Sequence, residues 1–210
     1  YRTMAAGTVL SRLRLALWGL VAVAAFAAGA LFLGNLQEAA RQGSSLPGAA
    51  RFGGDFQLVD HNGQAFSSEA LKGKPHALFF GFTHCPDICP TTLFEMTKHL
   101  EELGSKADAL KIFFVTVDPA RDTPEHLKKY LSAFDERITG LTGTPDQVAK
   151  AVKAYRVFAE KVPTGDGDYT MNHTATVYLF DAKGTLASTL SWQEDEKTRL
   201  AKLKRLADRG

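Results

Sequence analysis

The chain has 210 residues, of which 45% are hydrophobic, and its formal net charge is +2 at pH 7. This balance of charges argues against a nucleic-acid partner and against a strongly acidic partner. The length suits one soluble domain with an appendage.

The appendage is an uncharged apolar run at residues 15–33. A helix needs about 20 apolar residues to cross a bilayer, so we predict a single transmembrane helix at residues 15–34. Three arginines lie in residues 1–14, whereas few charges follow the run directly. This bias predicts that residues 1–14 form a basic cytoplasmic lead and that everything after the helix lies outside.

A cleaved signal peptide is the alternative to this anchor, because Ala28-Gly29-Ala30 resembles a small-residue cleavage site. The apolar run continues through Leu33, beyond that site, which favours the anchor. Residues 35–52 are rich in Ala, Gly and Ser, a composition typical of a flexible tether. We therefore predict that residues 53–210 form the folded domain.

The first predicted elements of this domain are a β-hairpin and a buried strand. Residues 56–59 and 65–67 flank an Asn62-Gly63 turn, a pair typical of tight hairpins. Residues 77–82 are an apolar run that is too short for a helix and is bounded upstream by Pro75. This run predicts a buried strand.

The motif FTHCPDICP at residues 82–90 ends this strand and contains both cysteines of the chain. Leucine and methionine recur at helical spacing from residue 91 to 103, and Pro90 is favoured at the first position of a helix. We expect Cys89 at or next to the cap of this helix. The helix dipole there favours a thiolate over a thiol.

Strands and helices alternate beyond the thiol motif. Thr123 and Thr144 are predicted to cap helices that begin at Pro124 and Pro145. The full set of later elements is a strand at residues 110–117, helices at 124–134 and 145–155, strands at 175–180 and 185–190, and a closing helix at 194–208. With a dithiol after the first long strand, this order predicts an α/β fold of thioredoxin-like layout with an N-terminal β-hairpin extension.

Two thiols separated by three residues have three interpretations. A structural disulfide would close a tiny loop, so its stabilising effect would be small. A redox dithiol that exchanges with partner disulfides suits low-pKa thiolates at a helix terminus. A soft-metal site needs a further ligand, for which histidine is the natural candidate.

Counting ligands excludes several metal centres. Iron–sulfur clusters normally need four cysteines, a c-type haem needs Cys-x-x-Cys-His, and structural zinc needs four ligands in paired sets. This chain has two cysteines and no second set. Copper(I) is satisfied by two thiolates and one imidazole, so copper is the best fit if a histidine reaches the loop.

His173 is the strongest candidate for that third ligand among six histidines. It lies just before the predicted strand at 175–180, and a thioredoxin-like fold brings the loop before that strand against the dithiol. His84 adjoins Cys85, but adjacent residues rarely converge on one ion. The other histidines are expected in less suitable places: His99 and His126 solvated on amphipathic helices, His61 in the hairpin turn, and His76 at the start of a strand.

Three motifs, in this order, resemble the Sco family, called SenC or PrrC in bacteria: FTHCPDICP at residues 82–90, VDPARDTP at 117–124 and YTMNHT at 169–174. The resemblance runs from about residue 56 to the C-terminus. It implies a thioredoxin-like copper protein in which Cys85, Cys89 and His173 bind one copper ion, Cu⁺ or Cu²⁺, per chain. It also implies a role in assembling the copper A centre of cytochrome c oxidase.

The resemblance further implies partners and a location. The expected partners are cytochrome c oxidase subunit II, a copper donor and a thiol reductant, with one helix in the membrane and no nucleic acid. The expected location is a bacterial inner membrane, with the N-terminus cytoplasmic and the domain periplasmic, and the mitochondrial inner membrane as the alternative.

One residue departs from the family pattern. Family members commonly carry Asp before the histidine, whereas this chain has Asn172, which removes a carboxylate from that position. Asp87 is either a weak oxygen donor to copper(II) or a helix cap, and we expect the cap. Asp118 and Arg121 are expected to shape the loop beneath the site as turn structure.

The favoured interpretation is a membrane-tethered copper chaperone that is not primarily an enzyme. The main rival is a thiol–disulfide oxidoreductase in which Cys85 and Cys89 are a redox-active dithiol that reduces oxidase cysteines. A thiol peroxidase of the same fold ranks last. His173 discriminates between the first two, because an exchanger has no use for an imidazole ligand.

Overall fold

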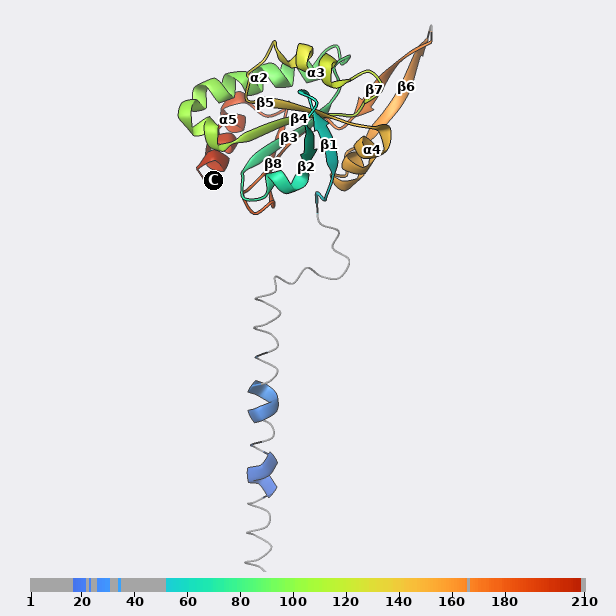
Figure 1. Ribbon diagram of the computed structural model, residues 1–210. Helices are drawn as coiled ribbons and strands as arrows, with labels where there is room; N and C mark the ends of the chain where they lie inside the picture. The colour runs from blue at the N-terminus through green and yellow to red at the C-terminus, as the bar shows by residue number, and fades with distance from the viewer. Residues whose placement is uncertain are drawn as a thin grey trace, which may run out of the picture. The chain divides into compact units, whose positions relative to one another are not determined.

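The computed structural model in Figure 1 describes residues 52–165 and 167–208, together with residues 17–21, 23, 26–30 and 34. The chain divides into two compact units, Tyr1–Ala50 and Arg51–Gly210. The described residues of the first unit are helical. No helix within the described ranges is both long and apolar enough to cross a membrane.

Most of the predicted N-terminal segments lie outside the described residues. These are the whole basic lead at residues 1–14, residues 35–51 of the tether, and residues 15, 16, 22, 24, 25 and 31–33 of the anchor. The lead, the anchor, its orientation and the tether therefore stay predictions.

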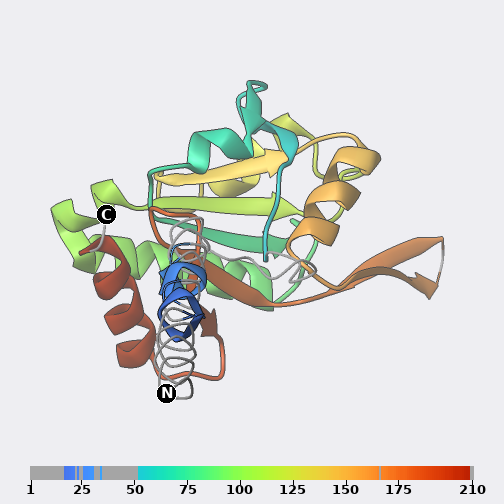
Figure 2. The same ribbon diagram turned by 90° about the horizontal axis from the view of Figure 1, so that it is seen from below.

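A seven-stranded sheet lies at the centre of the second unit (Figure 2). Its strand order is β2-β1-β5-β4-β3-β8-β9. The bounds are β1 (Gln57–Asp60), β2 (Ala65–Ser67), β3 (His76–Gly81), β4 (Lys111–Thr116), β5 (Ile138–Thr142), β8 (Thr176–Phe180) and β9 (Leu186–Ser191). Strands β3, β4 and β5 are parallel, and the other pairings are antiparallel.

Helices cover both faces of this sheet. They are α2 (Ile88–Leu103), α3 (Pro124–Leu131), α4 (Pro145–Ala154) and α5 (Glu196–Ala207), with short 3₁₀ helices η1 (Ser68–Leu71) and η2 (Gly104–Ala109). Helices α2 and α3 lie over the face that is uppermost in Figure 1, and α4 lies on the other face. Strands β3 and β4 are therefore buried on both sides, which explains why they are nearly continuous apolar runs.

The aromatic core shows the two faces directly. On one face Phe79 packs against Phe114, which in turn contacts Tyr130 of α3. On the other face Phe80 packs against Tyr155, the residue that follows α4. Successive residues of β3 thus point into two separate layers, as the alternation of side chains along a strand requires.

The predicted α/β layout is confirmed. The unit β3–α2–β4 is followed, after a longer connection, by the antiparallel pair β8–β9 beside β3 and the closing helix α5. This is the thioredoxin-like arrangement, and the antiparallel β1–β2 hairpin precedes it as the predicted extension. The carboxyl ends of β3 and β4 lie side by side, where open α/β sheets place their sites.

Three strands were not predicted. Strand β5 inserts between β4 and β1, although its sequence, Ile-Thr-Gly-Leu-Thr, is short and not strongly apolar. Strands β6 (Ala159–Gly165) and β7 (Asp168–His173) form a separate two-stranded ribbon that extends from the body of the domain (Figures 1 and 2). Strand β6 is largely exposed and contains Pro163, so it lacks the apolar pattern of the sheet strands.

The predicted caps are confirmed at α3 and α4, where the Thr123 and Thr144 side chains accept from backbone N–H groups. The predicted start of α2 was wrong. That helix begins at Ile88, so Pro90 is its third residue rather than its first. The first four N–H groups of a helix have no partner within it, so a proline there sacrifices no hydrogen bond.

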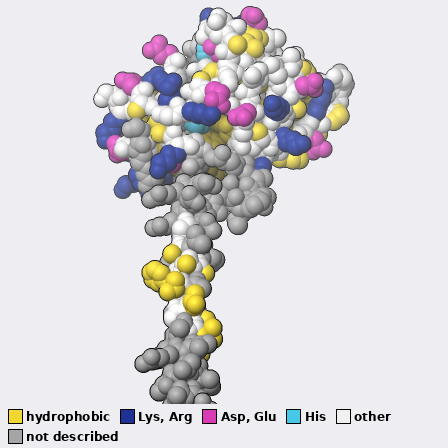
Figure 3. Space-filling model, turned by 60° about the horizontal axis from the view of Figure 1, so that its bottom comes forward, with side chains coloured by type: hydrophobic (Ala, Val, Ile, Leu, Met, Phe, Trp, Pro, Cys, Tyr) yellow, Lys and Arg dark blue, Asp and Glu magenta, His cyan; other side chains and the backbone are white. Residues whose placement is uncertain are grey.

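Charged side chains of both signs are interspersed over the described residues of the face in Figure 3. Basic and acidic groups are mixed on this face, without a large patch of one charge. Such a face exerts little long-range attraction on a polyanion.

Candidate metal centre

The two cysteines lie where β3 passes into α2. Cys85 is in the connecting loop, and Cys89 is the second residue of the helix. The backbone N–H of Cys89 donates a hydrogen bond to Cys85 Sγ at 3.5 Å. Asp87 occupies the N-cap position, but its side chain makes no capping hydrogen bond, so the expected capping role is wrong. One of the free N–H groups at this helix end, that of Cys89, donates to the Cys85 sulfur instead.

Gly81 at the end of β3 makes room for Cys89. A β-carbon at this position would lie 2.8 Å from Cys89 Sγ and 2.6 Å from Phe114 Cε2. Both distances are shorter than real β-carbon contacts. Any larger residue would therefore displace the sulfur or the ring beneath it. The glycine at the end of this strand is therefore a requirement of the site.

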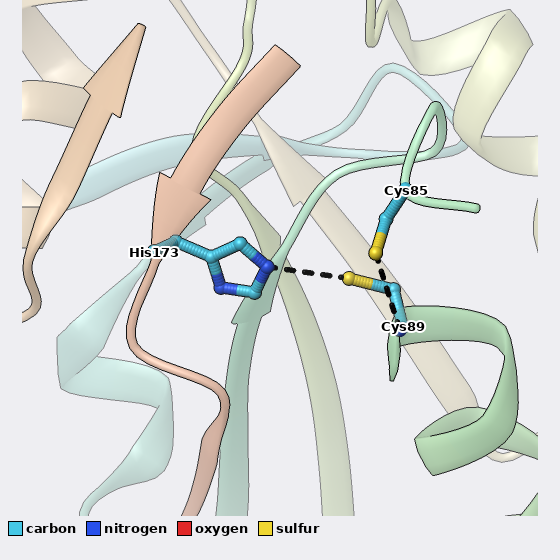
Figure 4. A group of neighbouring side chains, drawn as sticks. All are labelled: Cys85, Cys89 and His173. Atoms are coloured by element: carbon cyan, nitrogen blue, oxygen red, sulfur yellow. Dashed lines mark hydrogen bonds between the residues drawn. The ribbon is translucent and has the colours of Figure 1, made fainter. Parts of the chain in front are cut away.

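His173 completes the group from the other side (Figure 4). It is the last residue of β7, not a loop residue as expected. Its Nε2 lies 3.5 Å from Cys89 Sγ. Its Nδ1 lies 3.1 Å from the carbonyl oxygen of Thr174, and a carbonyl can only accept, so Nδ1 carries the proton. The Nε2 lone pair therefore faces the sulfur, which is the tautomer that a metal ligand needs.

The three donor atoms form a compact group. Cys85 Sγ, Cys89 Sγ and a ring nitrogen of His173 all lie within 4.8 Å of one another. Cys85 is 9% exposed and Cys89 is fully buried. A hollow of about 290 Å³ opens above them, lined by Phe82, Cys85, Pro86, Asp87, Ile88, Thr170, Met171, Asn172 and His173. Cys85 and His173 line this hollow, whereas the fully buried Cys89 does not.

The two thiols differ in pKa. The hydrogen bond from Cys89, together with nearby backbone N–H groups, lowers the pKa of Cys85 to about 4. The same hydrogen bond and burial raise the pKa of Cys89 well above the usual value. Cys85 is therefore the thiolate and Cys89 the thiol at neutral pH, a pairing suited both to exchange chemistry and to metal capture.

A cluster around Arg121 holds the ribbon that carries His173. The guanidinium donates to the Asp118 carboxylate and to the Tyr169 carbonyl at 2.9 Å, and it lies 3.8 Å over the Tyr169 ring. The Tyr169 hydroxyl donates to Asp118 at 2.9 Å. The Asp118–Arg121 pair was expected to be turn structure only. It also joins the loop after β4 to the start of β7.

The remaining histidines have other environments. His99 was expected to be solvated, but it is 1% exposed, so that prediction was wrong. His126 is exposed as expected. His61 accepts a hydrogen bond from the Gly140 N–H, and His76 stacks on Phe180 inside the core. None of these four contributes a donor to the Cys85, Cys89 and His173 group.

The chemistry of the donors fits a soft metal. Two sulfurs and one imidazole nitrogen suit Cu(I), which accepts low coordination numbers, better than Mg²⁺ or Ca²⁺, which prefer oxygen. Structural zinc requires a fourth ligand. Among the described residues, no fourth histidine, cysteine or carboxylate is grouped with these three.

A family model described as SCO1/SenC matches residues 44–208. The chain belongs to the SCO1/SenC family. This is the family that the three sequence motifs indicated.

Named relatives of the SCO1/SenC chain agree with this assignment. Mitochondrial protein SCO2 of Saccharomyces cerevisiae is 44% identical over 161 residues, which are 75% of this chain and 53% of that protein. The solved structure of Bradyrhizobium japonicum ScoI with copper bound is 50% identical, covers 74% of this chain and 99% of that chain, and has a TM-score of 0.69. This chain thus spans about half the length of its yeast relative.

A third SCO1/SenC relative bears on the dithiol. BsSco is a member of the Sco family of cytochrome c oxidase assembly proteins, and its solved structure identifies a disulfide switch. It is 25% identical, covers 76% of this chain and 95% of that chain, and has a TM-score of 0.60. Both copper binding and a thiol–disulfide change are therefore known among relatives of this fold.

Proposed function

We propose that this chain is a membrane-tethered copper chaperone that binds one copper ion through Cys85, Cys89 and His173. The observation that carries the proposal is the convergence of two sulfurs and an imidazole nitrogen within 4.8 Å, from segments far apart in the sequence. Thiolates select Cu(I) over harder ions. The copper-bound structure of a relative that is 50% identical supports the same metal.

The ion is cargo in this proposal. It is received from a copper donor after a thiol reductant has kept both cysteines reduced, and it is passed to the copper A centre of cytochrome c oxidase subunit II. The hollow above the donors supports a transfer route, because a partner's ligand can approach the ion from that side. The relative BsSco, as one of the cytochrome c oxidase assembly proteins, supports an oxidase as the destination.

The second candidate function is reduction of the subunit II cysteines by the dithiol. The lowered pKa of Cys85 favours it, because a thiolate is the attacking species in exchange. The Nδ1–H to Thr174 hydrogen bond favours the chaperone, since it fixes the lone pair of His173 on the sulfur side and has no purpose in exchange.

Replacing His173 by Ala separates the two functions. Removing a supporting partner of a ligand typically costs about 10–100-fold in metal affinity, and loss of a ligand itself should cost more. Thiol–disulfide exchange should persist, because Cys85 and Cys89 remain. The measurements are Cu(I) affinity by competition with a chelator and the rate of exchange with a model disulfide. Asn172→Ala, at the exposed neighbouring position, is the matched control.

Oxidase assembly in cells gives the decisive comparison. His173→Ala at normal protein level should abolish formation of copper A, as should Cys85→Ser and Cys89→Ser. Normal copper A with His173→Ala, together with failure of both cysteine variants, would identify the protein as a reductase.

We also propose that residues 15–34 anchor the chain in a bacterial inner membrane, with residues 53–210 as a periplasmic domain. The uncharged run and the arginines before it support this orientation. A phosphatase reporter fused after Arg51 should be active. Activity at the same position of a reporter that works only in the cytoplasm would contradict this topology.

A further inference from the structure

Two exposed histidines lie together beside the thiol loop. His84 directly precedes Cys85, and His126 is in the first turn of α3. Their rings are nearly parallel, with centroids 5.4 Å apart and an angle of 20° between planes. Both residues are exposed, so the stacking buries little apolar surface and packing alone gives little reason for it.

Asp122 lies next to this pair. One ring nitrogen from His84, one from His126 and one carboxylate oxygen of Asp122 are all within 4.8 Å of one another. Asp122 is 0% exposed, so its buried carboxylate lies beneath two exposed imidazole side chains. The three donor atoms are therefore close enough together to approach one ion.

The carboxylate is held in place by hydroxyl groups. Thr83 Oγ1 and Thr116 Oγ1 each donate to it at 2.6 Å. Thr83 Oγ1 also lies 3.1 Å from His84 Nδ1, so it connects the carboxylate to the ring. Such supporting bonds orient ligands in metal sites and preserve their geometry when no ion is bound.

We propose that His84, His126 and Asp122 form a second metal site, for a divalent transition ion of borderline softness. Two imidazoles and a carboxylate suit Cu²⁺, Zn²⁺ and Ni²⁺, and the Irving–Williams order favours Cu²⁺ among them. The site shares no donor with Cys85, Cys89 and His173, whose sulfurs suit Cu(I). It is therefore independent of the proposed function.

The position of this second site gives it a role. His84 and Cys85 are consecutive, so an ion held by the histidines lies at the edge of the loop that carries the thiolate. The two histidines of this site are exposed, whereas Cys85 and Cys89 are buried. The histidine site is thus suited to capture a divalent ion at the surface of the same loop.

The test uses the whole chain carrying Cys85→Ser, Cys89→Ser and His173→Ala, which removes every donor of the sulfur site. Equilibrium dialysis should show one Cu²⁺ bound per chain, and electron paramagnetic resonance should show splitting from two imidazole nitrogens. Adding His126→Ala should lower the affinity by about tenfold or more and remove one nitrogen from the spectrum. Asp122 is left intact, because the fold depends on its hydrogen bonds.

Glu125→Gln is the matched control, since it removes a negative charge beside His126 without removing a donor of the site. It should leave Cu²⁺ affinity within a factor of about two, the size of a weak surface charge effect. If the triple variant does not fold, the native chain with its cysteines oxidised to a disulfide replaces it. Absence of Cu²⁺ binding in a folded chain, or equal affinity with and without His126, would overturn the proposal.

Discussion

The pKa values of Cys85 and Cys89 are shifted in opposite directions, although the two residues are close in the sequence. Cys85 receives hydrogen bonds from the Cys89 thiol and backbone, which lowers its pKa to about 4. Cys89 is fully buried and keeps its proton. A metal ion must displace that one proton, whereas a partner disulfide meets a thiolate that is already formed at Cys85. The same pair therefore supports both candidate functions, and His173 is the residue that distinguishes them.

The prediction that His173 lies beside the two cysteines is confirmed, whereas the prediction that His99 is solvated was wrong. His99 lies three residues after Met96 and four before Leu103, so it shares the buried stripe of α2 with them. Helical spacing alone therefore indicated burial, and only the polar character of histidine argued against it. Within the described residues neither of its ring nitrogens has a hydrogen-bond partner. No signal in the sequence indicates that the rings of His84 and His126 stack.

His99→Leu should make the protein more resistant to acid. Burial lowers the pKa of His99 below its usual value of 6.5, so the unfolded chain binds this proton more readily than the folded one. The free energy of unfolding is therefore highest above about pH 6.5. It falls as the pH drops towards the pKa of the folded state, by at most about 1.4 kcal/mol per pH unit for each such group. Urea unfolding at pH 5 and pH 8 should show a smaller difference in the variant.

Some pH dependence should remain in that variant, because burial also lowers the pKa of His76, which is unchanged. The free energy of unfolding at pH 8 should be equal to the native value or higher, since a buried unpaired imidazole is replaced by a hydrocarbon. An unaltered difference between pH 5 and pH 8 would mean that His99 does not remain neutral in the folded state.

At the scale of elements, the β6–β7 ribbon positions the imidazole. Strand β7 pairs with β6 from Asp168 to His173, and the ribbon is fixed to the body through Arg121. The ribbon was missed because β6 is largely exposed and contains Pro163, and β7 is only half-buried, so neither strand shows a buried face in the sequence. Its turn, by contrast, was visible in the glycines at 165 and 167.

Arg121→Met should loosen this ribbon and weaken metal binding. Methionine keeps much of the apolar stem but loses the bonds to Asp118 and to the Tyr169 carbonyl. Copper affinity should fall by about tenfold, the lower range for a group that supports a ligand indirectly. Amide hydrogen exchange of residues 168–173 should become faster, while the rate of thiol exchange at Cys85 stays the same.

Lys161→Met is the matched control for that variant. Lys161 lies 3.6 Å from the centre of the same Tyr169 ring but belongs to the ribbon itself. An exposed cation–π contact contributes about 0.5–1 kcal/mol, so affinity should change by no more than a few-fold. Equal losses in the two variants would show that the Tyr169 ring, rather than the attachment through Arg121, determines the position of His173.

The helices and strands that the sequence predicts correctly are those determined by their own residues. Strands β3 and β4 are long apolar runs, and α3 and α4 begin at Thr-Pro pairs that cap them, so all four were predicted. Strand β5 was missed because its place in the sheet comes from partners on both sides, β4 and β1, rather than from its own composition. Long-range pairing of this kind leaves little trace in a short window of sequence.

The architecture also explains where the site lies. Parallel strands β3 and β4 end together, and the segments that follow them carry the two cysteines and the Arg121 cluster. The ribbon then brings His173 to the same edge from outside the sheet. Two donors thus come from the β3–α2 connection and one from the ribbon, so the proposed site is complete only when the ribbon is in this position.

X-ray absorption at the copper edge of the reduced whole chain, loaded with less than one equivalent of Cu(I), tests the ligand set most directly. Sulfur and nitrogen neighbours differ in bond length and scattering strength, so the two can be counted separately. We predict two sulfurs and one imidazole nitrogen around copper, and loss of the nitrogen in His173→Ala. A shell of nitrogen and oxygen alone, or an unchanged spectrum in that variant, would contradict binding through Cys85, Cys89 and His173.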